Sequence, residues 1–182
     1  PMIRSLVLLA WIAASVSAAP IVVTGDYVRA TFTDLGVLSH LWYDSTGTRN
    51  FGVNDYIAPG APWEGFAVRS GLGAAQVNNN NGSVQQIGGS ITSSSGGTTG
   101  GSVTWDGGTT DFTIQHVFSF SNSDRRVNIS TTFTALTALT TVRLSRFVDP
   151  DPDVNAFGTF QTVNQRGNTT LGLSVHERAD PV

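Results

Sequence analysis

The stretch "TDFTIQHVFSFS", residues 110–121, decides the fold class. Large apolar side chains and one histidine fall on alternate positions, and the positions between them carry Thr, Gln, Val and Ser. The alternating residues are Phe112, Ile114, His116, Phe118 and Phe120. A period of two is typical of a β-strand that buries one face. We therefore predict a half-buried strand, with His116 as a histidine of the core.

The same period recurs elsewhere in the chain, in segments rich in Val, Thr, Ile and Phe. The clearest are residues 27–33, 126–133 and 141–148, and clusters of Gly, Asp, Asn and Ser between strands are typical of hairpin turns. No segment shows a convincing helical period. We predict an all-β protein, an antiparallel β-sandwich in one domain over residues 19–182. Because residues 169–177 read as a strand with only a short tail after it, we also expect this domain to continue past Val182.

The first 18 residues have the form of a secretory signal peptide. Arg4 precedes a short apolar run, and Val16-Ser17-Ala18 offers small residues at a cleavage point. The run is too short for a membrane span, and no second long apolar run follows. We expect a mature chain without a membrane span, secreted, periplasmic or on the cell surface.

Composition excludes several kinds of chemistry. The chain has no cysteine and no lysine, so it can hold no disulfide, thiolate site, lysine Schiff base or phosphate-binding P-loop. Its net charge of −3 gives it no electrostatic reason to bind nucleic acid.

Residues 77–102 form a low-complexity segment of Gly, Ser, Thr, Asn and Gln. Such a composition buries little apolar surface. It indicates either a long flexible loop or small edge strands, such as residues 83–87, joined by glycine turns. The functional alternative is a glycan-binding or self-associating surface.

The segment "DPDPDVN", residues 149–155, concentrates hard oxygen ligands. Asp149, Asp151, Asp153 and Asn155 have the spacing of the first half of a calcium loop, but the later glycine and glutamate of an EF-hand are absent. Two interpretations remain open: a partial calcium site, or a stiff acidic turn. In the second, Asp149 or another carboxylate of this loop would pair with Arg146, which shares a strand face with apolar side chains. The alternative for Arg146 is a side chain that extends along the rim of the sheet and keeps its guanidinium in water.

Residues 54–71 are the second concentrated region, with aromatic side chains beside carboxylates. Tyr56, Trp63 and Glu64 could form a sugar-binding surface, since rings stack on sugar faces and carboxylates accept from hydroxyls. Beside Trp63, Glu64 could have a raised pKa and act as a general acid. The alternative is that the aromatic rings plug one end of the sandwich and Glu64 lies on its rim.

The segment "GDYVRATFTDLGVLSHLWYDSTGTRNF", residues 25–51, resembles the opening hairpin of galactose mutarotase-like sandwiches, and residues 118–146 are similar in style to their later strands. The resemblance covers roughly half the chain. It implies a large antiparallel sandwich, a longer domain and a sugar-related ligand. The family's catalytic residues cannot be matched to positions here, so none is carried over.

Three functions remain open at this point. The first is an exported binding or surface-structural module, with a glycan as the candidate ligand and calcium as the candidate stabilising ion. The second is the N-terminal part of a carbohydrate-active enzyme of mutarotase-like fold, with Glu64, Asp55 and His40 as the candidate catalytic residues. The third is a polymerising surface protein that self-associates through residues 77–102.

The calcium interpretation predicts that millimolar calcium raises the melting temperature of the full chain, because a ligand that binds only the folded state stabilises it. Asp151→Ala should abolish that rise. A thermal-shift measurement with calcium and with chelator checks this. A melting curve that calcium leaves unchanged would exclude the site.

Overall fold

The computed structural model describes residues 19–53, 55–58, 63–150, 162–166 and 177–181, the last two ranges by their backbone alone. The segment expected to be a signal peptide and the predicted calcium ligands Asp151, Asp153 and Asn155 lie outside the described residues. The strands are β1 (Ile21–Thr24), β2 (Val28–Phe32), β3 (Leu38–Tyr43), β4 (Trp63–Ser70), β5 (Gln76–Asn79), β6 (Val84–Gln85), β7 (Gly88–Gly96), β8 (Gly100–Gly108), β9 (Phe112–Ser121), β10 (Asn128–Ala135), β11 (Val142–Asp149), β12 (Thr162–Arg166) and β13 (Glu177–Pro181).

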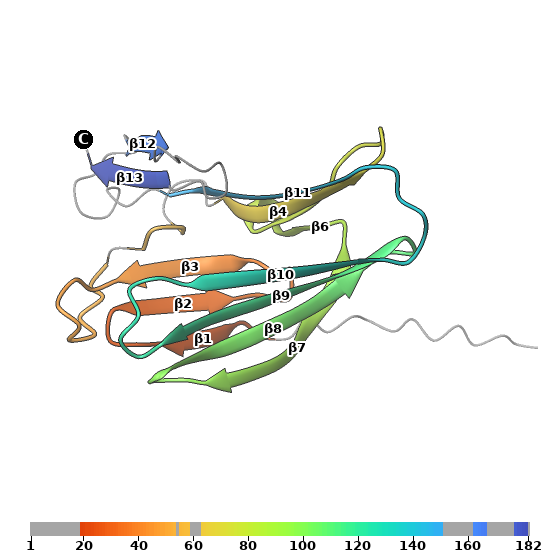
Figure 1. Cartoon of the computed structure of the whole chain (residues 1–182). Helices are drawn as coiled ribbons and strands as arrows, with labels where there is room; N and C mark the ends of the chain where they lie inside the picture. The colour runs from red at the N-terminus through yellow and green to blue at the C-terminus, as the bar shows by residue number, and fades with distance from the viewer. Residues whose placement is uncertain (1–18, 54, 59–62, 151–161, 167–176, 182) are drawn as a thin grey trace, which may run out of the picture.

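The strands form antiparallel sheets, as predicted (Figure 1). Three of them build the sandwich, with strand orders β1-β2-β3, β10-β9-β8-β7 and β11-β4-β5-β6, and β12 pairs with β13 separately. Within the described residues the single helical element is one 3₁₀ turn, η1 (Asn81–Ser83). No helix in the described part of the chain has the length and apolar character to cross a membrane.

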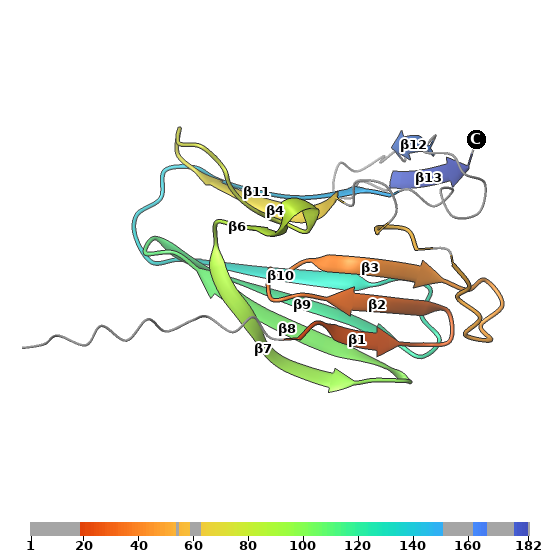
Figure 2. The ribbon, with the colours of Figure 1, turned by 180° about the vertical axis from the view of Figure 1, so that it is seen from behind.

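The β10-β9-β8-β7 sheet supplies the inner face on which the other two sheets pack. Figures 1 and 2 show it on one side of β1, β2 and β3, with β4, β6 and β11 lying across the top. Phe32 of β2 contacts Phe118 of β9 with ring centroids 4.9 Å apart, and Phe66 of β4 meets Trp105 of β8 edge-on at 5.5 Å. One aromatic layer therefore serves both facing sheets.

Strand β9 has the predicted alternation. All five of its alternate residues, from Phe112 to Phe120, are buried, which confirms His116 as a core residue. Nδ1 of His116 lies 2.8 Å from Oγ1 of Thr131, and its ring stacks on Trp105. Burial, and secondarily the charge of Arg146, lowers the pKa of His116 to about 3, so the imidazole is neutral in the folded protein.

The low-complexity segment is ordered β-structure. It contains β5, β6, β7 and the first part of β8, which corresponds to the small strands of the sequence prediction and not to the long flexible loop. Its glycines have a packing role around Trp105: a Cβ on Gly89 or Gly107 would collide with the indole ring. Indole Nε1 donates to the carbonyl of Asp34 at 2.7 Å, so the β2–β3 turn is fixed to the same ring.

We predict that Gly89→Ala destabilises the protein by roughly 1–3 kcal/mol, because the added methyl group overpacks Trp105 and the carbonyl of Asp106. Gly88→Ala is the matched control, since a Cβ at Gly88 has no neighbour within 4 Å. Urea unfolding of both variants measures the difference. Equal free energies of unfolding would show that these glycines do not cradle the indole.

Candidate functional site

Glu64 is the most deeply buried carboxylate described, with only 2% of its surface exposed. It lies on the inward face of β4, in phase with Phe66 and Val68. Its Oε2 accepts a 2.6 Å hydrogen bond from the backbone N–H of Leu38 in β3, and its Oε1 lies 2.6 Å from Nη2 of Arg146 in β11. One side chain thus links three strands that belong to two sheets.

Asn80 reinforces the same junction. Its Oδ1 accepts from the backbone N–H of Glu64 at 2.7 Å, and its Nδ2 donates to the carbonyl of Leu38 at 3.1 Å. Since β3 and β4 are not neighbours in a sheet, these polar side chains take the place of a backbone ladder between them.

Arg146 pairs with Glu64 and not with Asp149, one of the partners that the sequence suggested; the other carboxylates of that loop lie outside the described residues. In the β4–β11 register Arg146 lies opposite Phe66, so Glu64 is its diagonal neighbour on the same face. The guanidinium also lies over the ring of Phe118, 5.0 Å from its centroid. The contact with Glu64 is an ion pair by distance and not an aligned hydrogen bond, and Nε, Nη1 and Nη2 are buried without a hydrogen-bond partner in the part of the chain that is described.

Burial dominates the electrostatics of Glu64. Removal from water raises its pKa, and the charge of Arg146 and the amide of Leu38 oppose that rise without cancelling it. The raised pKa fits the sequence prediction for this residue. The cause is depth in the sandwich, because Trp63, the neighbour invoked from sequence, lies on the other face of β4.

A groove runs between β3 and β10 and contains this ion pair. Its inner part is a cavity of about 370 Å³, lined by Leu38, Leu41, Ile57, Glu64, Arg126, Val127, Ile129, Arg146, Phe147 and Val148. Its outer part is a cavity of about 500 Å³, lined by Val28, Leu41, Trp42, Tyr43, Tyr56, Arg125, Arg126 and Val127. The two cavities share Leu41, Arg126 and Val127, and we call them together the β3–β10 groove.

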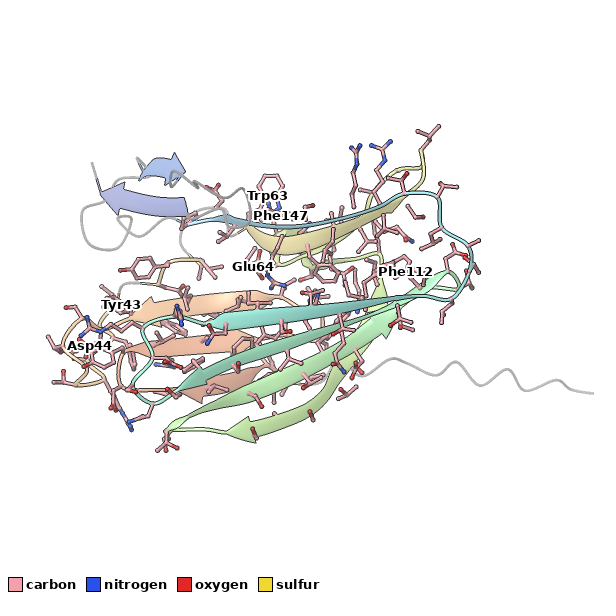
Figure 3. All side chains as sticks on the ribbon, in the orientation of Figure 1. Tyr43, Asp44, Trp63, Glu64, Phe112 and Phe147 are labelled. Carbon is pink, nitrogen blue, oxygen red and sulfur yellow. The ribbon has the colours of Figure 1, made fainter. Side chains whose placement is uncertain are left out.

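Two of the three predicted ligand-binding residues lie in the β3–β10 groove. Tyr56 lines its outer part and Glu64 its inner part. Trp63 does not join them: Figure 3 shows it on the outer side of β4, away from Glu64. It is 47% exposed and meets Phe147 edge-on at 6.0 Å. With Val148 and Asp149 it borders a hollow of about 310 Å³, which shares Phe147 and Val148 with the inner cavity.

His40 and Asp55 form a pair of their own. Nδ1 of His40 lies 2.5 Å from Oδ2 of Asp55, and Oδ1 of Asp55 accepts from the amides of Leu41, Ile57 and Ala58. His40 stacks on Trp42, whose ring lies under Arg29, on the outer face of the β1-β2-β3 sheet. The structure therefore joins two of the three candidate catalytic residues, while Glu64 faces inward with Arg146.

The predicted calcium ligands are described only in part. Asp149 ends β11 opposite Trp63 and is exposed. No group of three or more His, Cys, Asp or Glu side chains suited to a metal ion occurs among the residues described. The calcium site thus stays a prediction that rests on sequence.

Sequence analysis did not identify the arginines that line the β3–β10 groove. The sequence placed Arg126 only in the predicted strand 126–133 and Arg125 only in the turn before it. Both lie in the bend that precedes β10 and line the outer cavity together with Leu41, Trp42 and Tyr43 of β3. Arg125 lies over the ring of Tyr27 at 4.5 Å. Two adjacent arginines after an exposed turn are a local signal for a cationic surface, but only the fold places them opposite Tyr56 and Leu41.

Comparison with known proteins gave no match to a protein-family model, a curated protein or a solved structure. The resemblance to galactose mutarotase-like sandwiches therefore stays a prediction.

We predict that the stability difference between wild type and Glu64→Gln falls as pH rises above about 4.5, the ordinary value for a glutamate. A carboxyl with a raised folded pKa holds its proton after the unfolded chain has lost it, so its stabilisation is present below 4.5 and is lost as pH approaches the folded pKa. The slope is at most about 1.4 kcal/mol per pH unit.

Urea unfolding of both proteins across pH 4–8 measures this difference. The opposite pH dependence of His116 is common to the two proteins and cancels. A stability difference that grows with pH would mean that Arg146 lowers the pKa of Glu64 below its ordinary value.

Proposed function

We propose that this protein is an exported glycan-binding module that binds its ligand in the β3–β10 groove. The observation that carries the proposal is the pair of adjoining cavities, in which tyrosines, an apolar floor and charged groups line one continuous depression. Tyr43 and Tyr56 supply aromatic surface, and Leu38, Leu41 and Ile57 supply the apolar floor. Such a combination suits a sugar, which has apolar ring faces and a polar rim.

Burial and anchoring support a preformed site. Asp55 accepts from the amide of Ile57, which follows Tyr56, and from the amide of Leu41 in β3, and the backbone N–H of Tyr56 donates to the carbonyl of Leu41 at 2.7 Å. Glu64 and Asn80 fix Leu38 at the inner end. A site held by such contacts requires little ordering when a ligand binds, which favours affinity.

Export is the part of this proposal that rests on sequence alone. The motivation is the pattern of residues 1–18, a basic residue, a short apolar run and small residues at a cleavage point. Detection of a mature N-terminus after Ala18 in the culture medium or periplasm would support export.

A second candidate function is catalysis by a carbohydrate-active enzyme, and the His40–Asp55 pair favours it. An ionised carboxylate accepts only, so Asp55 fixes the proton of His40 on Nδ1 and leaves Nε2 free to accept. The side chain of His40 is 41% exposed, so this nitrogen can meet a substrate. Glu64 would not act with it, because Glu64 points into the sandwich beside Arg146.

The binding proposal predicts that Tyr56→Ala weakens glycan binding about tenfold or more, which corresponds to about 1.4 kcal/mol. Trp63→Ala is the matched control, an aromatic truncation on the outer face of β4. Calorimetry or affinity electrophoresis against a panel of oligosaccharides measures both, with circular dichroism to confirm folding. Tyr56→Phe keeps the ring and should retain most of the affinity.

If Trp63→Ala weakens binding and Tyr56→Ala does not, the ligand binds at the surface formed by Trp63 and Phe147 and not in the groove. If both variants bind oligosaccharides as tightly as the wild type, or if the wild type binds none, the proposed binding site in the groove is wrong. Hydrolysis or epimerisation of a bound sugar that His40→Ala abolishes would favour the enzyme.

A further inference from the structure

The walls of the β3–β10 groove have a charge opposite to that of the chain. The protein as a whole carries a net charge of −3, yet three arginines and one glutamate line the groove. Among the described residues of its lining, the groove is cationic whether or not Glu64 is ionised, because that one carboxylate cannot balance Arg125, Arg126 and Arg146. The nearest acidic neighbour in the adjoining turn, Asp124, accepts from the amide of Ser121 at 2.6 Å and interacts with Arg126.

The inner end of the groove has hydrogen-bond donors in excess. Arg146 faces Glu64 through Nη2, while Nε and Nη1 find no acceptor among the described side chains and carbonyls. A buried donor without a partner is costly, and a ligand oxygen at this point would remove that cost. A guanidinium offers its donors in a planar fork, which fits a carboxylate better than a hydroxyl.

The middle and the outer part of the groove each carry a further arginine. Arg126 lines both cavities, so it lies where a ligand spanning the groove must pass. Arg125 lies over the ring of Tyr27 and lines the same cavity as Tyr43, so its guanidinium is held beside the aromatic lining. Positive charge is therefore distributed along the groove and not confined to one end.

We propose that the glycan bound in the β3–β10 groove is acidic, with uronate carboxylates that contact Arg126 and Arg146 while sugar faces lie against Tyr43 and Tyr56. The inference rests on the proposed glycan-binding function. Apolar floor and tyrosines account for the sugar rings, and the excess of guanidinium groups accounts for negative charge on them. A neutral glycan would offer no carboxylate to Nε and Nη1 of Arg146, which face away from the ion pair with Glu64.

Titration calorimetry of the full chain with oligogalacturonate and with its methyl ester tests this proposal, because the ester keeps the sugar backbone and removes the charge. The acid should bind at least about tenfold more tightly than the ester, the loss expected for one charge-assisted hydrogen bond. Its affinity should also fall as sodium chloride increases, since salt screens exposed charges.

Arg126→Gln should reduce the preference for the acid several-fold without abolishing it, because Arg125 and Arg146 still line the groove. Arg143→Gln is the matched control, since Arg143 lies on the opposite face of β11 from Arg146 and should change nothing. Arg126 is substituted in place of Arg146 because loss of Arg146 would leave Glu64 buried beside no positive charge. Circular dichroism confirms that both variants fold.

Each other outcome overturns a distinct part of the account. Equal affinity for acid and ester, or no effect of Arg126→Gln, overturns the acidic ligand and leaves the glycan-binding function standing. Absence of binding to every oligosaccharide, neutral ones included, overturns the function itself. Equal affinity for polyglutamate would show that the ligand is an acidic peptide and not a sugar. Tighter binding of a sulfated oligosaccharide would show that the groove prefers sulfate groups to carboxylates.

Discussion

The buried contact between Glu64, the amide of Leu38 and the guanidinium of Arg146 is the constraint on which the arrangement of the sandwich depends. Strands β3 and β4 belong to different sheets and share no ladder, so side chains must set their separation. Glu64 and Asn80 do so. Asn78 of β5 joins the same sheet to the β2–β3 turn by donating to the carbonyl of Leu35, and it also donates to the carbonyl of Ile87 after β6. Removing one partner of such a buried pair costs more than the pair contributes, because the other is left unbalanced.

This junction also explains why there is a groove. The β10-β9-β8-β7 sheet faces two sheets, and where those two meet, the apolar core gives way to Glu64 and Arg146 with space beside them. Both β10 and β11 are edge strands among the described elements, and Ile129, Leu144 and Val148 along them are exposed. The apolar lining of the groove therefore continues to the surface, and the arginines of its wall keep that opening charged.

The core of the protein follows from its sequence to a large extent. Period two placed Val28, Ala30 and Phe32 on one face of β2 and His116 in the core, and the burial of these residues confirms it. The low-complexity segment was harder, because its glycines are used for close approach to Trp105 and not for flexibility. The composition of a segment indicates how much apolar surface it can bury. It does not indicate which aromatic ring will pack against its glycines.

The sequence identified some residues of the candidate site but not how they are arranged in space. Tyr56 and Glu64 were recognisable as polar and aromatic residues in a rigid segment, but the alternation of β4 sends Trp63 and Glu64 to opposite faces, which separates a pair that looked like one unit. The partnership of Glu64 with Arg146 depends on the register of β4 with β11, over 80 residues apart in the chain, and no local pattern encodes it.

The most direct test of the account is a crystal structure of the protein with a bound oligogalacturonate. The account predicts sugar density along the β3–β10 groove, with a uronate carboxylate within hydrogen-bond distance of the guanidinium groups of Arg126 or Arg146. Sugar stacked on Trp63 and Phe147 at the outer face of β4 and β11, with no sugar in the β3–β10 groove, would contradict it.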